Sequence, residues 1–200
     1  MKINSATLST PIGDLLIQAT TEEIQSLTFI EPEKDDLFSS LYLKESLQSE
    51  EVDKLRNYPL LMEACKQIKE YFQGTRCYFK LPLKTFGTPI EQKVYRFVSI
   101  VPYGHVVSYQ DLAQMVYIEN GARFIGNCMR KNPMPILIPC HRVITNTGKM
   151  GGFSAGTDRK KFLLQWEKTN WEMNHESSSS GRWLWYTFKR RNGEQTETTH

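Results

Sequence analysis

The chain lacks the residues and patterns that define several protein classes. Only 4 of its 200 residues are cysteine, and they are scattered, which excludes a disulfide scaffold and favours a reducing compartment. No apolar run approaches the roughly 18 residues that a membrane-spanning helix needs, and the first residues lack the apolar stretch of a signal peptide. We therefore expect a soluble intracellular protein with no membrane partner.

Motifs for metals and nucleotide cofactors are also missing. No pair of cysteines or histidines has the spacing of a zinc site, and residues 1–85 contain no histidine. No glycine-rich phosphate loop or dinucleotide fingerprint occurs. We therefore expect neither a metal nor a cofactor.

The composition is that of a folded protein with an uneven charge. Hydrophobic residues make up 40% of the chain and aromatic residues 12%, so it can bury a sizeable core. Residues 1–85 carry 10 Lys/Arg against 13 Asp/Glu, whereas residues 101–168 carry 9 against 4. A basic second half indicates an anionic partner, although a solvated basic surface would give the same count.

Residues 1–85 predict a small α+β domain. The turn sequence Pro11–Asp14 separates two short apolar runs, a third run follows, and a helix over 59–73 begins at a proline and ends at a glycine. The predicted strands are Ala6–Thr10, Leu15–Thr20, Ile24–Ile30 and Cys77–Leu83. Together they form a β-meander with one helix, and residues 31–57 are expected to be a loop that could include a short helix.

Residues 86–168 predict a second, mostly helical domain. Thr88–Glu91 is a capping box that opens a helix, and Ser108–Asp111 is a second such box. The segment 109–131 fits a helix-turn-helix, and a last helix is expected to begin near Thr157 and to end at about Lys168. Residues 169–200 are expected to be a flexible tail, in which the aromatic and basic segment 183–191 could alternatively anchor to nucleic acid or a membrane surface.

The predicted helix over 122–131 has two different faces. Its apolar face consists of Phe124, Ile125, Cys128 and Met129, and its polar face consists of Arg123, Gly126, Asn127 and Arg130. Arginines and an amide are the residue types that contact phosphates and base edges in DNA. The helix is therefore a candidate for DNA binding, although an ordinary amphipathic helix would show the same pattern.

A proline-rich apolar segment leads to Cys140, His141 and Arg142. The run Ile136–Ile138 is expected to form a short, buried, extended segment. A cysteine is nucleophilic as a thiolate, which needs a base or a cation nearby, and His141 and Arg142 are both candidates. Because adjacent residues of a strand point apart, a direct contact would need a turn at Cys140 or a bridging water. A buried structural cysteine is the competing interpretation.

The motifs of residues 87–168 resemble one family with high specificity. The matching segments are Gly87–Pro89, Val101–Gly104, Val107–Tyr109, Ala122-Arg123, Gly126-Asn127, Met129-Arg130, Asn132-Pro133 and Ile138–Val143. They are similar to the active-site domain of the O6-alkylguanine-DNA alkyltransferases, also called methylated-DNA–protein-cysteine methyltransferases. The resemblance implies direct repair of double-stranded DNA by a protein that acts once, as a monomer, on O6-alkylguanine and O4-alkylthymine. Such a protein would be cytoplasmic in a prokaryote and nuclear in a eukaryote.

The resemblance also implies a role for each matching residue. Cys140 would accept the alkyl group, and His141 would take its proton through a water molecule. Glu167 would orient His141, and Asn132 would tie the preceding turn to the segment that bears Cys140. This arrangement is similar to a hydrolytic triad put to a different use.

Further residues would hold the flipped base and the DNA. Tyr109 would donate to N3 of guanine, the carbonyls of Cys140 and Val143 would accept from its amine, and Ser154 would lie near O6. Arg123 would enter the base stack from the minor groove. The remaining DNA contacts would come from the same helix, through Ala122, Gly126, Asn127 and Arg130. Phe153 departs from the tyrosine that is frequent in the family, so the pocket keeps an aromatic wall but lacks a hydroxyl.

Two alternatives remain open from the sequence. A lesion-recognition protein on the same scaffold would flip alkylguanine without repairing it, but such relatives have tryptophan at the position of Cys140. A cysteine hydrolase could use Cys140, His141 and Glu167, but it would not need the DNA-facing helix.

Overall fold

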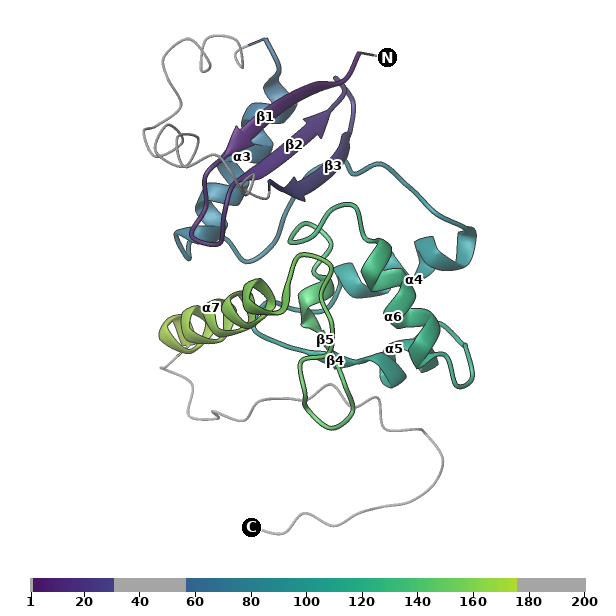
Figure 1. Cartoon of the computed structure of the whole chain (residues 1–200). Coiled ribbons are helices and arrows are strands. Elements are labelled where there is room, and N and C mark those ends of the chain that lie inside the picture. Colours follow the sequence, from purple (N-terminus) through teal and green to yellow (C-terminus); the bar gives the residue numbers. More distant parts are fainter. Residues whose placement is uncertain (1, 31–56, 176–200) are drawn as a thin grey trace, which may run out of the picture.

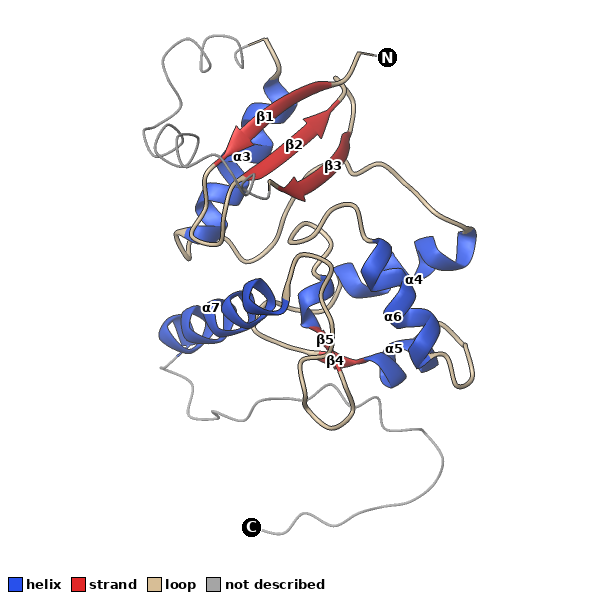
Figure 2. Cartoon of the chain, viewed as in Figure 1, coloured by secondary structure: helices blue, strands red, loops and turns tan. Residues whose placement is uncertain are grey.

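The computed structural model describes residues 2–30 and 57–175, which form two lobes (Figure 1). The N-terminal lobe contains β1 (Asn4–Leu8), β2 (Leu15–Ala19), β3 (Ile24–Phe29) and α3 (Pro59–Phe72). The C-terminal lobe contains α4 (Pro89–Ser99), β4 (Val107–Ser108), α5 (Tyr109–Met115), α6 (Ala122–Lys131), the 3₁₀ turn η1 (Cys140–Arg142), β5 (Val143–Ile144) and α7 (Thr157–His175). The predicted α+β class, with a meander-plus-helix unit before a mostly helical one, is confirmed (Figure 2).

The N-terminal sheet follows from the alternation of apolar residues. Its order is β1-β2-β3, both pairs are antiparallel, and Ile17 lies opposite Ala6 on one side and Leu27 on the other. These side chains are buried on one face, against which α3 packs (Figure 1). The buried face of α3 consists of Leu61, Ala64, Cys65, Gln67, Ile68 and Tyr71.

The strand predicted at Cys77–Leu83 is wrong. Only Leu83 forms a bridge, with Ile24, and the neighbouring backbone bonds run from Ile24 N to Pro82 O and from Lys84 N to Ile24 O. Pro82 has no N–H to donate, and the backbone N–H of Lys80 donates instead to the side chain of Gln67. A longer ladder therefore cannot form here.

The C-terminal lobe begins with well-capped helices. The side chain of Thr88 accepts a hydrogen bond from the backbone of Glu91, whose carboxylate accepts from the backbone of Thr88 in return, which completes the predicted capping box. Ser108 caps α5 by accepting from the backbone of Asp111. The pair α5–α6 forms the predicted helix-turn-helix, and α6 has the predicted bounds.

α7 extends beyond its predicted end at Lys168 and reaches His175. Its last turns have few apolar residues, so their periodicity gives a weak signal, but tertiary contacts hold them. The ring of Trp171 lies edge-on to that of His105 at 5.2 Å, and the side chain of Asn170 packs against Gly74 just after α3. The segment 31–57, apart from its last residue, and the tail segment 183–191 lie outside the described residues.

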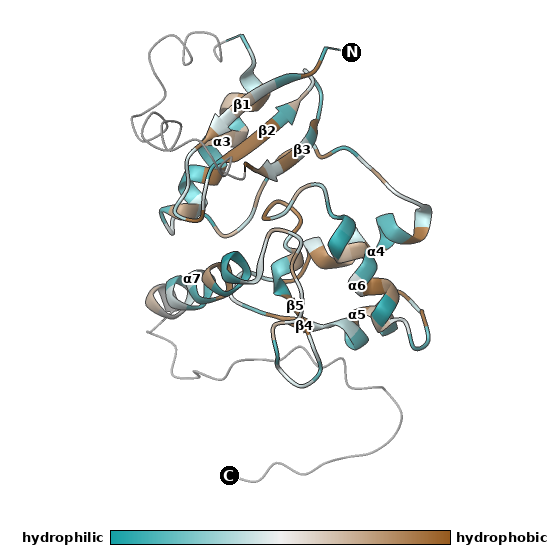
Figure 3. Cartoon of the chain, viewed as in Figure 1, coloured by the Kyte–Doolittle hydropathy of each residue, from teal (hydrophilic) through white to brown (hydrophobic). Residues whose placement is uncertain are grey.

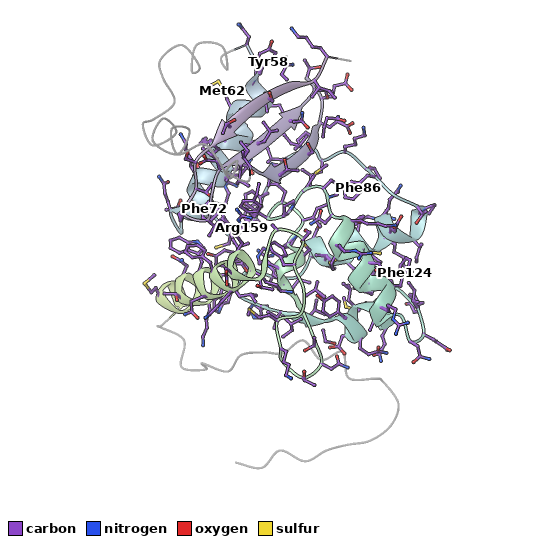
Figure 4. The ribbon with its side chains drawn as sticks, viewed as in Figure 1. Tyr58, Met62, Phe72, Phe86, Phe124 and Arg159 are labelled. Carbon is purple, nitrogen blue, oxygen red and sulfur yellow. The ribbon has the colours of Figure 1, made fainter. Side chains whose placement is uncertain are left out.

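The two lobes meet at the start of α7. The guanidinium of Arg159 donates to the carbonyl of Ile12 at 2.9 Å and lies 4.4 Å from the centre of the Phe29 ring (Figure 4). Within the described ranges, no helix is both long and apolar enough to cross a membrane.

Candidate active site

The chain reaches Cys140 through a tight turn, and the extended segment expected at Ile136–Ile138 is therefore wrong. Ile136 and Leu137 lie in the turn between Pro135 and Ile138, which form an isolated bridge. Ile136 has a φ of 74°, an unfavourable conformation for a β-branched residue, and it is 1% exposed. Packing in the core thus holds a strained turn directly before the cysteine.

Asn132 braces this turn at both ends. Its Nδ2 donates to the carbonyl of Ile138 at 2.9 Å, and its Oδ1 accepts from the backbone N–H of Met134 at 3.0 Å. The same Nδ2 lies 3.0 Å from Sγ of Cys140. The side chain therefore links the end of α6 to the segment that bears the cysteine, which is the contact that the family resemblance implies.

Cys140 is the first residue of η1 and is 1% exposed. Burial raises the pKa of its thiol to about 11, although the hydrogen bond from Asn132 and the charge of Lys160 act in the opposite direction. The resting group is therefore a thiol at neutral pH. It needs a proton acceptor before it can act as a nucleophile.

His141 is held by a buried carboxylate. Its Nε2 lies 2.8 Å from Oε1 of Glu167, and both side chains are essentially inaccessible to solvent. Burial lowers the pKa of His141, and the nearby Glu167 offsets this only in part. A neutral imidazole that donates through Nε2 carries its lone pair on Nδ1. That atom is buried and has no hydrogen-bond partner among the described residues.

Glu167 also pairs with Arg142. The guanidinium donates to both carboxylate oxygens at 2.9 Å, and a further bond runs from Gly104 N to Oε2 at 3.2 Å. Burial alone would raise the pKa of Glu167, but Arg142 and His141 hold it well below the usual range. The sequence places Arg142 beside Cys140 as a candidate cation. In the structure its positive charge is paired with the carboxylate of Glu167.

Lys160 is a buried residue of this site that the sequence analysis missed. Its Nζ donates to the carbonyls of Val143 at 2.6 Å and Gly152 at 3.3 Å. Burial lowers the pKa of its ammonium group to about 8. A lysine in the first turn of a helix normally faces solvent, so the sequence carries no signal for this position.

A pocket of about 610 Å³ opens beside α5 and α6. Its lining consists of Tyr109, Ala122, Gly126, Met129, Arg130, Gly152, Phe153 and Ser154. Tyr109 donates to Gly152 O at 3.4 Å, and burial raises the pKa of its hydroxyl, which therefore stays protonated. The ring of Phe153 lies edge-on to that of His141 at 6.5 Å. The structure thus brings the predicted base-binding residues Tyr109, Phe153 and Ser154 together. Val143, Arg123 and Cys140 are not part of the lining.

The faces of α6 match their predicted character. Ile125, Cys128 and Met129 are buried, Phe124 is partly buried, and Arg123, Asn127 and Arg130 are exposed. Figure 3 shows hydrophilic and hydrophobic residues mixed along this helix. A Cβ added at Gly126 would meet nothing within 4 Å. Another surface can therefore approach the helix closely at this point.

A helix-turn-helix with an exposed basic face, and a pocket whose Phe153 wall adjoins the buried Cys–His–Glu cluster, define a nucleic-acid-binding protein with a cysteine nucleophile. Within residues 2–30 and 57–175, no three His, Cys, Asp or Glu residues are grouped to hold a metal. Residues 3–85 match the ribonuclease-like domain and residues 89–169 the DNA-binding domain of 6-O-methylguanine DNA methyltransferase. The chain belongs to this family.

Relatives of known function cover most of the chain. The constitutive methylated-DNA–protein-cysteine methyltransferase of Bacillus subtilis is 35% identical over 83% of this chain and 96% of its own length. That of Methanosarcina barkeri is 30% identical over 82% and 96%.

Solved structures show the same fold. The O6-methylguanine methyltransferase of Mycobacterium tuberculosis has 28% identity and a TM-score of 0.68, covering 84% of this chain and 94% of that one. A structure of the same mycobacterial protein in complex with DNA has 27% identity and a TM-score of 0.65, over 82% and 92%.

Proposed function

We propose that this protein repairs double-stranded DNA by transferring the alkyl group of O6-alkylguanine, and of O4-alkylthymine, to Cys140. Membership of the family supports DNA repair by alkyl transfer to a cysteine. One observation supports Cys140 as the acceptor. Of the four cysteines, only Cys140 adjoins a neutral, carboxylate-bound histidine, in the cluster beside the pocket. In this proposal the protein is a monomer. It acts once per molecule, because no group among the described residues around Cys140 would remove the alkyl group from sulfur.

The reaction begins with removal of the thiol proton. Nδ1 of His141 accepts this proton through a water molecule, while Glu167 holds the imidazole through Nε2. The thiolate attacks the alkyl carbon, so a C–S bond forms as the bond between carbon and O6 breaks. The electron pair of the broken bond stays on guanine, which becomes neutral when the proton held by His141 returns through water to its N1. Until then, a hydrogen bond at N3 stabilises the negative charge. The hydroxyl of Tyr109 is the proposed donor there. The products are a thioether and normal guanine.

The damaged base must leave the helix to reach this site. α6 enters the minor groove and Arg123 occupies the space in the base stack, which offsets part of the unstacking cost of a few kcal/mol. Phe153 forms the aromatic wall of the pocket, and Ser154 lies near O6. The carbonyls of Cys140 and Val143 accept from the guanine amine. Val143 O already accepts from Lys160, but a carbonyl oxygen has two lone pairs and can accept both bonds.

Replacing the nucleophile tests this proposal. Cys140→Ser should abolish single-turnover transfer from O6-methylguanine duplex DNA, because the serine hydroxyl does not ionise to an anionic nucleophile near neutral pH as a thiol can. The affinity for DNA should be preserved. Cys77→Ser is the matched control, since Cys77 is exposed and free. Transfer by Cys140→Ser above a few per cent of the wild-type rate would refute the assignment.

A further inference from the structure

One hydroxyl of the N-terminal lobe enters the catalytic cluster. Tyr71 lies near the end of α3, and its hydroxyl donates to Oε1 of Glu167 at 2.8 Å. Both groups are buried, and they are 96 positions apart in the sequence. The ring-nitrogen donor of His141 and the guanidinium of Arg142 also reach this same oxygen, at 2.8 Å and 2.9 Å.

The position of the Tyr71 hydroxyl is fixed from both lobes. Its ring packs edge-on against Phe72 at 5.1 Å and against Tyr103 at 5.8 Å. Its backbone carbonyl accepts from the indole of Trp166, one residue before Glu167 on α7, at 3.1 Å. Burial raises the pKa of the Tyr71 hydroxyl well above its ordinary value, with Glu167 adding to the effect. The group therefore remains a hydrogen-bond donor across the working pH range.

We propose that Tyr71 is a positioning residue for alkyl transfer. Through its hydroxyl, the N-terminal lobe sets how strongly Glu167 stabilises the protonated form of His141. Three donors share Oε1, so each reduces the negative charge that the oxygen offers to the other two. Without the Tyr71 hydroxyl, Glu167 stabilises the imidazolium more strongly. As the pH falls, His141 then becomes protonated at a higher pH than in the wild type. The neutral imidazole, which has to accept the thiol proton, is lost at that point. This inference rests on the proposed role of His141 as the proton acceptor.

Other charged and titratable groups near His141 stay in place when Tyr71 is changed. Cys140 and Arg142 flank it on η1, and Glu167 and Lys160 face it from α7. The N-terminal lobe contributes Tyr71, and the loop after α4 contributes Tyr103, whose buried hydroxyl has no partner among the described residues. Tyr71→Phe therefore removes one hydrogen bond without moving a formal charge.

The test compares Tyr71→Phe with Tyr103→Phe. Each change removes one buried hydroxyl from the same aromatic cluster, but only the first breaks a bond to Glu167. Single-turnover transfer from an O6-methylguanine duplex is measured from about pH 5 to 9. The ring signals of His141 are titrated by NMR and assigned with His141→Gln. Melting curves of each variant set a temperature at which all are folded.

We expect the His141 midpoint to rise by about 0.5–1 pH unit in Tyr71→Phe, as the loss of one hydrogen bond implies. The transfer rate should then fall about three- to tenfold on the acid side and return to the wild-type value at high pH. Tyr103→Phe should leave both curves unchanged. An equal loss of rate at every pH with an unmoved midpoint would assign Tyr71 a purely structural role and overturn the proposal, as would wild-type curves.

The outcome is separable from failure of the proposed function. If Cys140→Ser remains active, the acceptor assignment fails, and with it the catalytic meaning of Tyr71. The NMR midpoint does not depend on transfer activity, so a shift there still shows that the hydroxyl acts on the Glu167–His141 pair. An unmoved midpoint refutes the Tyr71 proposal even where Cys140 is proven to be the acceptor.

Discussion

The N-terminal lobe buries apolar side chains almost throughout, whereas the C-terminal lobe also buries charged and polar side chains, several of them around Cys140. Among the described residues of the first lobe, the buried polar side chains are Thr20 and Gln67. The second lobe buries Glu91, Ser108, Asn132, His141, Arg142, Lys160, Glu167 and Asn170. Buried charges are costly unless they are paired, so the second lobe gives up stability that an apolar core would provide.

This difference reflects two roles: the N-terminal lobe is a packed scaffold, and the C-terminal lobe holds the reactive groups. The sheet and α3 need only fill space, and hydrophobic burial is sufficient for that. The C-terminal lobe has to keep a thiol, a neutral histidine and an ionised carboxylate together away from water. Arg142 makes this possible, because its positive charge balances the negative charge of Glu167. His141 therefore does not have to be protonated in order to neutralise the carboxylate. The predictions below begin with this pair.

The largest effect is expected at Glu167. Glu167→Gln leaves the guanidinium of Arg142 buried without a counter-charge, which should cost about 3–5 kcal/mol in the free energy of unfolding and abolish transfer. Glu70→Gln is the comparison in the N-terminal lobe, because Glu70 pairs with Arg76 near the surface. That change should cost about 1 kcal/mol or less. Chemical denaturation measures both, and equal losses would contradict the contrast between the lobes.

The next effect concerns the exposed face of α6. Arg123→Ala should slow repair of duplex DNA by roughly ten- to a hundredfold, because part of the unstacking cost of a few kcal/mol is no longer offset. Reaction with the free alkylated base needs no flipping and should change little. Single-turnover kinetics on the two substrates give the comparison. Equal losses on both would mean that Arg123 acts on the fold or on the chemistry.

A smaller effect is expected at Phe153, which is half-buried in the pocket wall. Phe153→Tyr adds a hydroxyl that can donate to the flipped base, and a neutral hydrogen bond is worth about 0.5–1.5 kcal/mol. The single-turnover rate should then rise roughly two- to twelvefold, if the bond forms only in the transition state. Thermal melts of both proteins complete the test. A slower and less stable tyrosine variant would show that the pocket is adapted to the phenyl ring.

Periodicity predicts most of the scaffold. The alternation in β1 and β2 and the apolar stripe of α6 follow from burial of one face, so the sequence predicts them directly. β3 departs from alternation, because its register against β2 shifts. Proline and glycine correctly mark the ends of α3, and Thr88 the start of α4. The strand at Cys77–Leu83 fails because Gln67, a distant residue, takes the backbone donor of Lys80. A contact between residues this far apart cannot be predicted from the pattern of neighbouring residues.

The same limit applies to the site. The family resemblance implies that Cys140, His141, Asn132 and Glu167 act together. In the structure Asn132 contacts Cys140 and His141 contacts Glu167. The roles of Arg142, Lys160 and Tyr71 depend on which groups tertiary folding brings to Glu167 and Val143. Tyr71 in particular carries the signature of an ordinary core aromatic on an amphipathic helix. Its hydroxyl gains a catalytic neighbour only when the two lobes meet.

The central claim is that Cys140 becomes permanently alkylated. Peptide-resolved mass spectrometry, after one incubation with a duplex containing O6-methylguanine, tests it most directly. We predict one added methyl group on the peptide that contains Cys140 and none on the peptides that contain Cys65, Cys77 or Cys128, with no more than one repaired base per protein molecule. Repaired DNA beside an unmodified Cys140, or a methyl group on another cysteine, would contradict the account.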